Sequence, residues 1–492
     1  MPTLREKCGI FGVFAPGEGV ARLTFFGIHA LQHRGQESAG IAATDGRSIT
    51  MRGGMGLVSQ VFTEDHLEDL EGVAAIGHTR YSTTGASIEC NTQPLVVSDQ
   101  GDHRPLLDGE VRQLALAHNG NIVNADTLRA DLESQGITFE TTTDSEVLAQ
   151  LLATAPGGTW DERFAVLMRR AVGAYSLTVL TRDALFGVRD PNGIRPLAIG
   201  RLNNGVERYV LASETCALDQ IGAKFLREVE PGEVVRIDEA GLTSWFPAEP
   251  QRRALCLFEY TYFARLDSRM RGELLYQSRM NLGAELARQH HVDADVVIGV
   301  PDSATAAAIG YARESGIPYV EGIIKNRYVG RTFIQPDQRL RERGARLKYN
   351  PLPEMLAGKR VIVVDDSIVR GTTTPHVVAM IRAAGATEVH MRITTPQIQH
   401  PCFYGVDMAT KDQLIGAHMT VEQVRVHIGA DSLGHLTLDR TIAATNQPEG
   451  ELCTACFSGQ YPGVVPLQLD KLALGTAEAA AAASEVPAAA TV

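Results

Sequence analysis

The chain has 492 residues, of which 44% are apolar and 21% charged, so it is long enough for two or three domains with full hydrophobic cores. Its formal net charge of −12 argues against a general binder of nucleic acid or of an anionic membrane surface. No apolar run reaches the roughly 18 residues of a membrane-spanning helix, the first residues lack a signal peptide's apolar core, and seven cysteines are not a disulfide framework. We therefore expect a cytoplasmic protein with no nucleic-acid or membrane partner.

The first half of the chain predicts a layered α+β domain. From residue 8 to about 245, short β-rich runs such as Tyr175-Ser-Leu-Thr-Val-Leu follow one another, and helical stretches interrupt them at 21–33 and 144–153. Successive strands with a few helices between them are typical of sheets and helices packed in layers.

Cys8 begins an apolar strand pattern, Cys8-Gly-Ile-Phe-Gly, close to the start of the chain. Inside a chain, such a cysteine is usually a core residue. Removal of residues 1–7 would instead make it N-terminal, and its own α-amino group, with a pKa of about 7.7–8.0, would then be a base able to activate the thiol. Taken alone, this pattern is only a weak indication of a nucleophile.

Four further segments belong with Cys8. They read Gln32-His-Arg-Gly-Gln-Glu-Ser-Ala-Gly, Gly77-His-Thr-Arg-Tyr-Ser-Thr-Thr-Gly, Ala117-His-Asn-Gly-Asn-Ile and Thr142-Thr-Asp-Ser-Glu. Together with Cys8 they resemble the class II glutamine amidotransferases, whose glutaminase domain has an N-terminal nucleophile. The resemblance implies an αββα-layered glutaminase domain over residues 8–245, preceded by a prosegment at 1–7.

The same resemblance gives each matched residue a role. Cys8 would attack the side-chain amide of glutamine, while Asn119 and the Gly120 backbone N–H would hold the oxyanion, each donor contributing roughly 3–4 kcal/mol. Arg80 and Asp144 would pair with the α-carboxylate and α-ammonium of glutamine. The glutamine-binding set is completed by two residues that would order the site, Arg34 and Tyr81.

The second half predicts an α/β domain. The sequence pattern changes around Pro247 and Pro250, which marks the domain boundary. Beyond about residue 270, apolar strands alternate with helices, which indicates a parallel sheet over residues 255–465. The expected strands are 296–300, 319–324, 361–366 and 389–394. Residues 475–492 are rich in alanine without an apolar period, so we expect a disordered tail there.

Residues 361–374 carry the most informative motif, Val-Ile-Val-Val-Asp-Asp-Ser-Ile-Val-Arg-Gly-Thr-Thr-Thr. Paired aspartates at a strand end are common, and an Asp-Ser helix cap is the ordinary interpretation. Here a buried strand precedes them and a Gly/Thr-rich loop leads into a helix, whose N-terminus is a natural phosphate site. The carboxylates of Asp365 and Asp366 would then hold ribose hydroxyls or a hydrated Mg²⁺.

This motif resembles the phosphoribosyl-pyrophosphate (PRPP) loop of type I phosphoribosyltransferases. Val300-Pro-Asp-Ser-Ala-Thr, after another buried strand, resembles their pyrophosphate loop. The basic run 325–348 could be a solvated face, but it resembles the mobile loop that closes over PRPP and excludes water. The resemblance implies Mg²⁺ at Ser303, Asp365 and Asp366, and PRPP binding by Asp302, Ser303, Lys325, Arg331, Asp365, Asp366, Ser367, Arg370, Gly371, Thr372 and Thr373.

Four cysteines gather in the second half: Cys256, Cys402, Cys453 and Cys456. Cys453-Thr-Ala-Cys456 alone could be redox-active or structural, and four thiolates suit zinc as well as an iron–sulfur cluster. Judged from the ligands alone, zinc is favoured. Their contexts, such as His400-Pro-Cys-Phe-Tyr-Gly, instead resemble the iron–sulfur type of amidophosphoribosyltransferase, which implies a structural [4Fe–4S] cluster.

Taken over residues 8 to about 465, the chain resembles the amidophosphoribosyltransferase family. The resemblance implies synthesis of 5-phosphoribosylamine from glutamine and PRPP, ammonia passed between two sites, a homotetramer, and inhibition by purine nucleotides. Glucosamine-phosphate synthases and asparagine synthetases share only the first half, and PRPP-binding transcriptional regulators only the second. A regulatory protein with an inactive glutaminase half is opposed by the intact Cys8, Arg80, Asn119 and Asp144.

Overall fold

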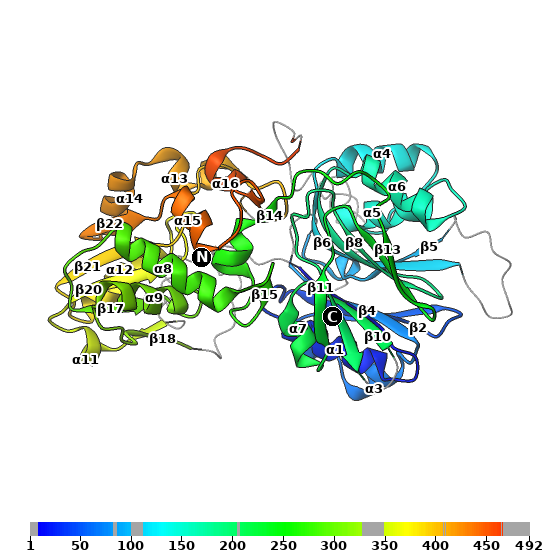
Figure 1. The fold of residues 1–492 in the computed structure, drawn as a ribbon, viewed down its shortest axis with the longest axis horizontal. Helices are drawn as coiled ribbons and strands as arrows, with labels where there is room; N and C mark the ends of the chain where they lie inside the picture. The colour runs from blue at the N-terminus through cyan, green and yellow to red at the C-terminus, as the bar shows by residue number, and fades with distance from the viewer. Residues whose placement is uncertain are drawn as a thin grey trace, which may run out of the picture. The chain divides into compact units, whose positions relative to one another are not determined.

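The chain divides into two compact units (Figure 1). The first runs to Leu255 and includes the short segment from Phe403 to Val406, and the second comprises Cys256–Cys402 and Thr410–Tyr461. The expected prosegment and C-terminal tail lie outside the described residues. The computed structural model describes residues 8–81, 86–99, 112–203, 207–326, 349–406, 408, 410–463 and 465.

Two antiparallel sheets form the centre of the first unit. The seven-stranded sheet has the order β11-β9-β10-β1-β4-β2-β3, and the six-stranded sheet has the order β13-β12-β8-β7-β6-β5. Within each sheet, neighbouring strands pair antiparallel. The strands are β1 (Gly9–Phe14), β2 (Ser38–Thr44), β3 (Ile49–Met55), β4 (Ala74–Arg80), β5 (Leu95–Ser98), β6 (Gln113–Ile122), β7 (Gly173–Leu180), β8 (Leu185–Arg189), β9 (Ala198–Asn203), β10 (Glu207–Ala212), β11 (Lys224–Glu228), β12 (Val234–Asp238) and β13 (Gly241–Trp245).

Successive strand residues point to opposite faces of a sheet, so each sheet has two faces to bury. One face packs against the other sheet, and helices cover the outer face. Ile10 and Phe14 of β1 belong to a core cluster whose members come from both sheets. Phe11 and Val13 pack instead with residues of α1, while Leu116 of β6 packs with residues of α4, α5 and α6. The order helix, sheet, sheet, helix confirms the predicted αββα layers. The helices are α1 (Val20–Ala30), α2 (Val58–Val61), α3 (Glu64–Glu68), η1 (Glu89–Asn91), α4 (Ala125–Ser134), α5 (Asp144–Ala153), α6 (Trp160–Arg170) and α7 (Thr215–Gln220).

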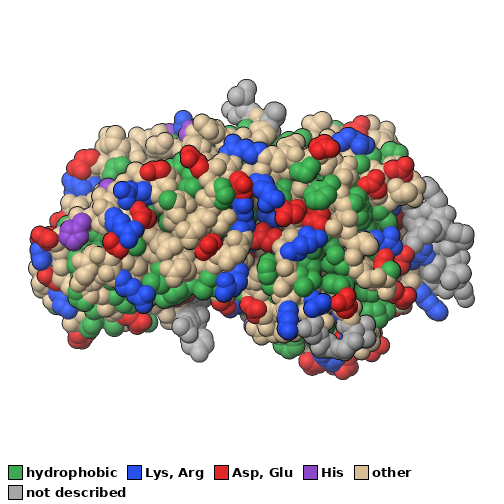
Figure 2. Space-filling view, in the orientation of Figure 1, with side chains coloured by type: hydrophobic (Ala, Val, Ile, Leu, Met, Phe, Trp, Pro, Cys, Tyr) green, Lys and Arg blue, Asp and Glu red, His purple; other side chains and the backbone are tan. Residues whose placement is uncertain are grey.

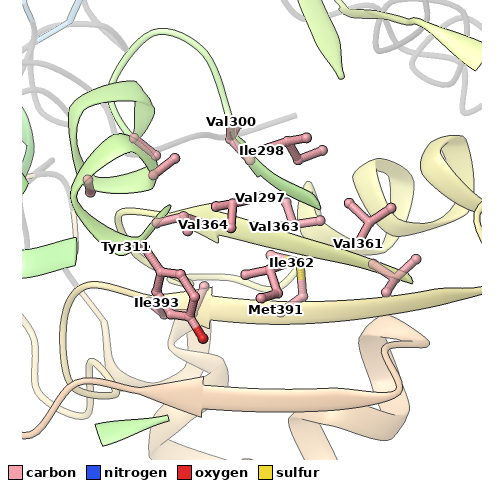
Figure 3. Packing of buried hydrophobic residues seen from close by; sticks show 14 of the residues in the cluster. Val297, Ile298, Val300, Tyr311, Val361, Ile362, Val363, Val364, Met391 and Ile393 are labelled. Atoms are coloured by element: carbon pink, nitrogen blue, oxygen red, sulfur yellow. The ribbon is translucent and has the colours of Figure 1, made fainter. Parts of the chain in front are cut away.

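A four-stranded parallel sheet, ordered β17-β20-β21-β22, forms the core of the second unit. Residues 361–364 of β20 are all fully buried, as expected for a parallel strand with helices on both faces. Figure 3 shows them packed with Ile298 of β17 and Met391 of β21. This arrangement confirms the predicted α/β domain with a parallel sheet.

The remaining elements of the second unit are helices around that sheet and short strand pairs. The helices are α8 (Leu275–Gln289), α9 (Thr305–Ser315), α11 (Pro353–Leu356), α12 (Thr374–Ala383), α13 (Ile415–His418), α14 (Val421–Ile428), α15 (Leu438–Ala444) and α16 (Ala455–Ser458), with η2 (Glu259–Phe263) and η3 (Lys411–Gln413). The sheet strands are β17 (Val296–Gly299), β20 (Arg360–Asp365), β21 (Glu388–Ile393) and β22 (Ser432–His435). The short strands are β14 (Leu255–Cys256), β15 (Arg269–Met270), β16 (Glu273–Leu274), β18 (Ile323–Lys325), β19 (Tyr349–Pro351) and β23 (Leu452–Cys453).

One expected strand of this sheet is shorter than predicted. Within 319–324, only Tyr319 forms a parallel bridge, to Val297 of β17. The chain then leaves the sheet, and Ile323 pairs antiparallel with Pro351 in the β18–β19 ribbon. The apolar run is therefore divided between two pairings, which hydrophobicity alone does not distinguish.

The surface carries both signs of charge. On the face drawn in Figure 2, Lys and Arg side chains lie among Asp and Glu side chains. Several are exposed ion pairs, such as Arg22 with Glu64 at 2.8 Å and Arg288 with Glu314 at 2.7 Å, which contribute little to stability. None of the described helices is long and apolar enough to cross a membrane.

Candidate functional site

A pocket in the first unit collects most of the residues predicted for glutamine chemistry. Cys8 lies just before β1, Arg80 ends β4, Gly120 lies in β6, and Asp144 begins α5. Strands from both sheets and the N-terminus of a helix therefore meet here, although their residues are far apart in sequence. The lining residues are Cys8, Arg80, Tyr81, Gln93, His118, Gly120, Thr143, Asp144 and Ser145.

The Cys8 thiol is buried in this pocket. Its Sγ donates to the main-chain oxygen of Tyr81 at 3.4 Å. Burial raises the pKa of Cys8 to about 11, although the Tyr81 hydrogen bond and the charge of Arg80 act in the opposite direction. The thiol is therefore neutral at neutral pH, and it needs a base before it can act as a nucleophile.

Two opposite charges line the pocket beside the thiol. Arg80 and Asp144 are both almost fully buried. Asp144 Oδ2 accepts a hydrogen bond from the Ile122 backbone N–H at 2.9 Å. Arg80 Nη1 lies 3.7 Å from Glu37 Oε2. A buried guanidinium and a buried carboxylate in one small pocket suit a zwitterionic amino acid.

The predicted oxyanion donors lie on β6. Gly120 lines the pocket, and a Cβ at this position would lie 1.9 Å from the Ala174 carbonyl oxygen, so only glycine fits. Asn119 is buried but is not among the lining residues. Neither its Nδ2 nor its Oδ1 has a hydrogen-bond partner in the described part of the chain. A buried amide without a partner is rare in folded proteins.

Arg34 is buried behind the pocket and does not line it. Its Nε donates to the main-chain oxygen of Cys8 at 3.2 Å, so it holds the backbone of the predicted nucleophile. Its Nη1 donates to Glu214, a residue that the motifs did not single out. Glu214 lies 180 positions away in the sequence, and nothing local marks it.

A hydrogen-bonded network that includes Gln93 supports the pocket wall. Gln93 Oε1 accepts from the His118 backbone N–H at 2.9 Å, and Gln93 Nε2 donates to Ser145 Oγ at 2.9 Å. His118 Nδ1 is hydrogen-bonded to the same Ser145 hydroxyl at 3.1 Å. Burial lowers the pKa of His118, so its ring is neutral. His118 and Ser145 lie inside the recognised motifs, whereas Gln93 gave no sequence signal.

The second candidate site lies at the carboxyl ends of β17 and β20. Asp366 Oδ2 accepts from Ser303 Oγ at 2.6 Å, and Asp366 Oδ1 accepts from Ser367 Oγ at 2.6 Å. Its main-chain oxygen accepts from the Thr395 hydroxyl at 2.9 Å. Burial raises the pKa of Asp366, against the effect of the two serine hydroxyls. Asp365 Oδ1 accepts from the Asp366 backbone N–H at 2.9 Å, so both predicted aspartates lie at this edge of the sheet.

The loop 367–373 runs from these aspartates to helix α12, which begins at Thr374. Gly371 has φ of +65°, and a Cβ there would lie 2.4 Å from Ile415 Cδ1, so this turn requires glycine. Arg370 donates from Nε and Nη2 to Gln413 Oε1, at 3.1 and 2.7 Å. The predicted loop residues Ser367 to Thr373 thus precede a helix N-terminus, where backbone N–H groups favour a phosphate.

The pyrophosphate loop also meets Lys325, the first residue of the basic run, at this edge. Lys325 Nζ lies 2.7 Å from Asp302 Oδ2. Burial raises the pKa of Tyr349, and the charges of Asp365, Asp366 and Asp302 raise it further. Arg331 and the rest of the predicted closing loop lie outside the described residues.

The four cysteines converge in space. Strand β14, which ends in Cys256, pairs with β23, which ends in Cys453. Burial, followed by the charges of Cys402, Cys256 and Cys453, raises the pKa of Cys456 well above its ordinary value. Among the described residues, no group of three or more His, Cys, Asp or Glu side chains is arranged so that it could hold a metal ion.

Comparisons with known proteins cover nearly the whole chain. Residues 91–220 match a glutamine amidotransferase domain, and residues 273–396 match a phosphoribosyl transferase domain. The chain is 52% identical to an amidophosphoribosyltransferase of Synechococcus elongatus (96% of this chain, 95% of the relative) and 46% identical to one of Bacillus subtilis (93% and 94%). It is also similar to a solved glutamine PRPP amidotransferase from B. subtilis in complex with ADP and GMP, with a TM-score of 0.86, 45% identity, and coverage of 94% of this chain and 99% of that one.

Proposed function

Because the chain belongs to the amidophosphoribosyltransferase family, we propose that the Cys8 pocket and the Asp365–Asp366 edge carry the two half-reactions of this enzyme. The enzyme converts glutamine, PRPP and water into 5-phosphoribosylamine, glutamate and pyrophosphate. This reaction is the first committed step of purine synthesis. One half-reaction releases ammonia from glutamine, and the other joins ammonia to the ribose.

The glutaminase half is assigned to Cys8 on one observation above all: its thiol lies in a pocket with the opposite charges of Arg80 and Asp144. Arg80 would pair with the α-carboxylate of glutamine and Asp144 with its α-ammonium group. The Cys8 thiol would attack the side-chain amide, and Gly120 N–H with Asn119 would stabilise the oxyanion. Since the thiol is neutral, the α-amino group of a terminal Cys8 would take its proton.

The PRPP half is assigned to the edge formed by Asp302, Ser303, Asp365, Asp366 and the loop 367–373. Carboxylate and hydroxyl oxygens are the ligands that Mg²⁺ prefers, so Ser303, Asp365 and Asp366 suit that ion. When bound, Mg²⁺ would supply charge neutralisation to the leaving pyrophosphate. The backbone of the loop before α12 would hold a phosphate, and Lys325 would add a positive charge nearby.

A [4Fe–4S] cluster is proposed for Cys256, Cys402, Cys453 and Cys456. Their thiolates are the ligand type that iron–sulfur clusters use, and the effect of three of them on the pKa of the fourth supports their proximity. The cluster would tie β14 to β23 and to the residues around Cys402, which is a structural role.

We propose three further properties. A cytoplasmic location is proposed because none of the seven cysteines, all of which lie in the described part of the chain, forms a disulfide, as is usual where thiols are kept reduced. The B. subtilis enzyme was solved with ADP and GMP, which supports inhibition of this chain by purine nucleotides. A homotetramer is expected from the family resemblance alone.

The two assignments are tested by comparing two nitrogen sources. Cys8→Ala is expected to abolish synthesis from glutamine and to keep synthesis from a high concentration of ammonia. Asp365→Asn combined with Asp366→Asn is expected to stop synthesis from both. Loss of the ammonia-dependent reaction in a folded Cys8→Ala protein would show that the two sites are not separable.

A further inference from the structure

The backbone around Cys8 is held by residues that follow strand β10. The Ile10 backbone N–H donates to Ser213 Oγ at 3.0 Å, and the Ser213 backbone N–H donates to the Ile10 carbonyl oxygen at 3.0 Å. The Arg34 Nε bond to the Cys8 oxygen adds a third contact, at 3.2 Å. The chain at 213–214 therefore lies next to the first residues of β1.

Glu214 is the fully buried anion behind this arrangement. Its Oε1 accepts from Arg34 Nη1 and lies 2.7 Å from His33 Nε2, and its Oε2 accepts from Cys216 Sγ at 3.7 Å. Burial alone would raise the pKa of Glu214, but the charges and hydrogen bonds of His33 and Arg34 hold it well below its usual range. Glu214 is therefore ionised, and Arg34 is fixed between its carboxylate and the Cys8 carbonyl oxygen.

We propose that Glu214 is a positioning residue for the glutaminase reaction, because it fixes Arg34, and Arg34 fixes the carbonyl oxygen of Cys8. In a terminal Cys8, no preceding peptide plane would restrain the α-amino group. The torsion about the Cα–C bond of Cys8, which the position of the carbonyl oxygen sets, would then decide where the amine and the thiol arm lie relative to the pocket. By holding the oxygen, Arg34 and Glu214 would keep the amine and the thiol together in the orientation that faces the glutamine pocket.

This role differs from ordinary stabilisation by a buried ion pair. The same unit contains a matched pair, Asp99 with Arg163, which is also buried, with Nη2 2.6 Å from Oδ1. The Arg163 side chain donates its other hydrogen bonds to the Leu152 oxygen, and neither partner lines the pocket. Breaking either buried pair costs stability. Of these two pairs, only Glu214–Arg34 is hydrogen-bonded to the backbone of Cys8, through Arg34 Nε.

The test is Glu214→Gln, which keeps the size of the side chain and removes its charge. Glutamine-dependent kcat is expected to fall at least about tenfold, because small misplacements of reacting groups are costly. The KM for glutamine is expected to stay within about threefold, since Arg80 and Asp144 remain in place. Ammonia-dependent synthesis in the same sample reports that the PRPP half is intact, and the retained KM for glutamine reports that the glutamine pocket is folded. Glu214→Asp is expected to recover part of kcat.

Asp99→Asn is the matched control. It removes an equally buried charge from the same unit, and it is expected to lower stability without lowering glutamine-dependent kcat. Wild-type kcat and KM in Glu214→Gln, or an equal loss of kcat in Asp99→Asn, would overturn the proposed role. If Glu214→Gln also loses ammonia-dependent synthesis, Arg34→Lys is measured instead. A lower glutamine-dependent kcat with an unchanged KM for glutamine would support the role, and an unchanged kcat would overturn it.

The role rests on Cys8 as the nucleophile, so Cys8→Ala is assayed in parallel. If Cys8→Ala still uses glutamine, the proposed glutaminase site is wrong. If Cys8→Ala is inactive with glutamine while Glu214→Gln works at the wild-type rate, only the positioning role is wrong.

Discussion

Ser303 and Asp366 connect the two loops of the PRPP site through a 2.6 Å hydrogen bond from Ser303 Oγ to Asp366 Oδ2. The residues are 63 positions apart, and they follow strands β17 and β20, which pair in parallel. Since parallel strands end at the same edge of a sheet, one hydrogen bond joins the predicted pyrophosphate loop to the paired aspartates.

Ser303→Ala is expected to weaken PRPP binding. The change removes one of the two serine donors to the buried Asp366 carboxylate, and a hydrogen bond to a charged group contributes about 1.5–3 kcal/mol. The KM for PRPP is therefore expected to rise about tenfold or more, equally with glutamine and with ammonia. Steady-state assays measure this, with Ser315→Ala at the end of α9 as the control. An unchanged KM would contradict the assigned site.

Active enzyme is expected to begin at Cys8 and to lack residues 1–7. The reason is the buried thiol, whose pKa of about 11 leaves it neutral, so that it depends on a base such as its own α-amino group. N-terminal sequencing with intact-mass measurement checks this on fully active protein. Preparations that use glutamine at full rate while retaining Met1 or Pro2 would be incompatible with an α-amino base.

Protein purified without oxygen is expected to be brown, with about four irons and four sulfides per chain. Cys456→Ser leaves three thiolates, so soluble yield is expected to fall with the loss of the structural tie. Cys90→Ser, which changes an exposed cysteine outside the group, is the control. A colourless protein with one zinc and no labile sulfide would mean that the zinc alternative is right.

Acid is expected to destabilise the protein through His78. Burial lowers the pKa of His78 to about 3, below its usual value near 6.5, so between these values the unfolded chain binds a proton that the folded chain does not. The contribution of His78 is therefore complete above about pH 6.5 and is lost as pH falls, by up to about 1.4 kcal/mol per pH unit. His78→Gln is expected to flatten the dependence of unfolding on pH between 6.5 and 5, whereas His66→Gln, at an exposed position, is not. Parallel curves for wild type and His78→Gln would exclude this residue as the cause.

Elements with a strong local pattern could be predicted from the sequence. Strand β20 and its paired aspartates follow from an uninterrupted β-branched run that ends in two carboxylates. The Cys8 pocket follows from five separated motifs. Element ends were less predictable: α1 stops at Ala30 rather than at 33, because the chain turns and the Gln32 side chain donates to the Gly35 oxygen and accepts from the Val58 backbone N–H.

Residues whose role depends on distant partners could not be predicted. The role of Glu214 depends on its contacts with Arg34 and His33, which lie about 180 positions earlier in the chain. Gln93 likewise connects to His118 and Ser145 through the fold alone. Such contacts are set by how strands pair across a sheet, and single-sequence patterns do not carry that information.

The central claim, that two sites on one chain serve one reaction, is tested most directly by tracing nitrogen. Enzyme is supplied with PRPP and glutamine labelled with ¹⁵N at the amide, in the presence of excess unlabelled ammonium at neutral pH. If ammonia released at Cys8 passes directly to the PRPP site, the phosphoribosylamine formed carries ¹⁵N. Product whose label matches the ammonium in solution would show that the two half-reactions are not coupled.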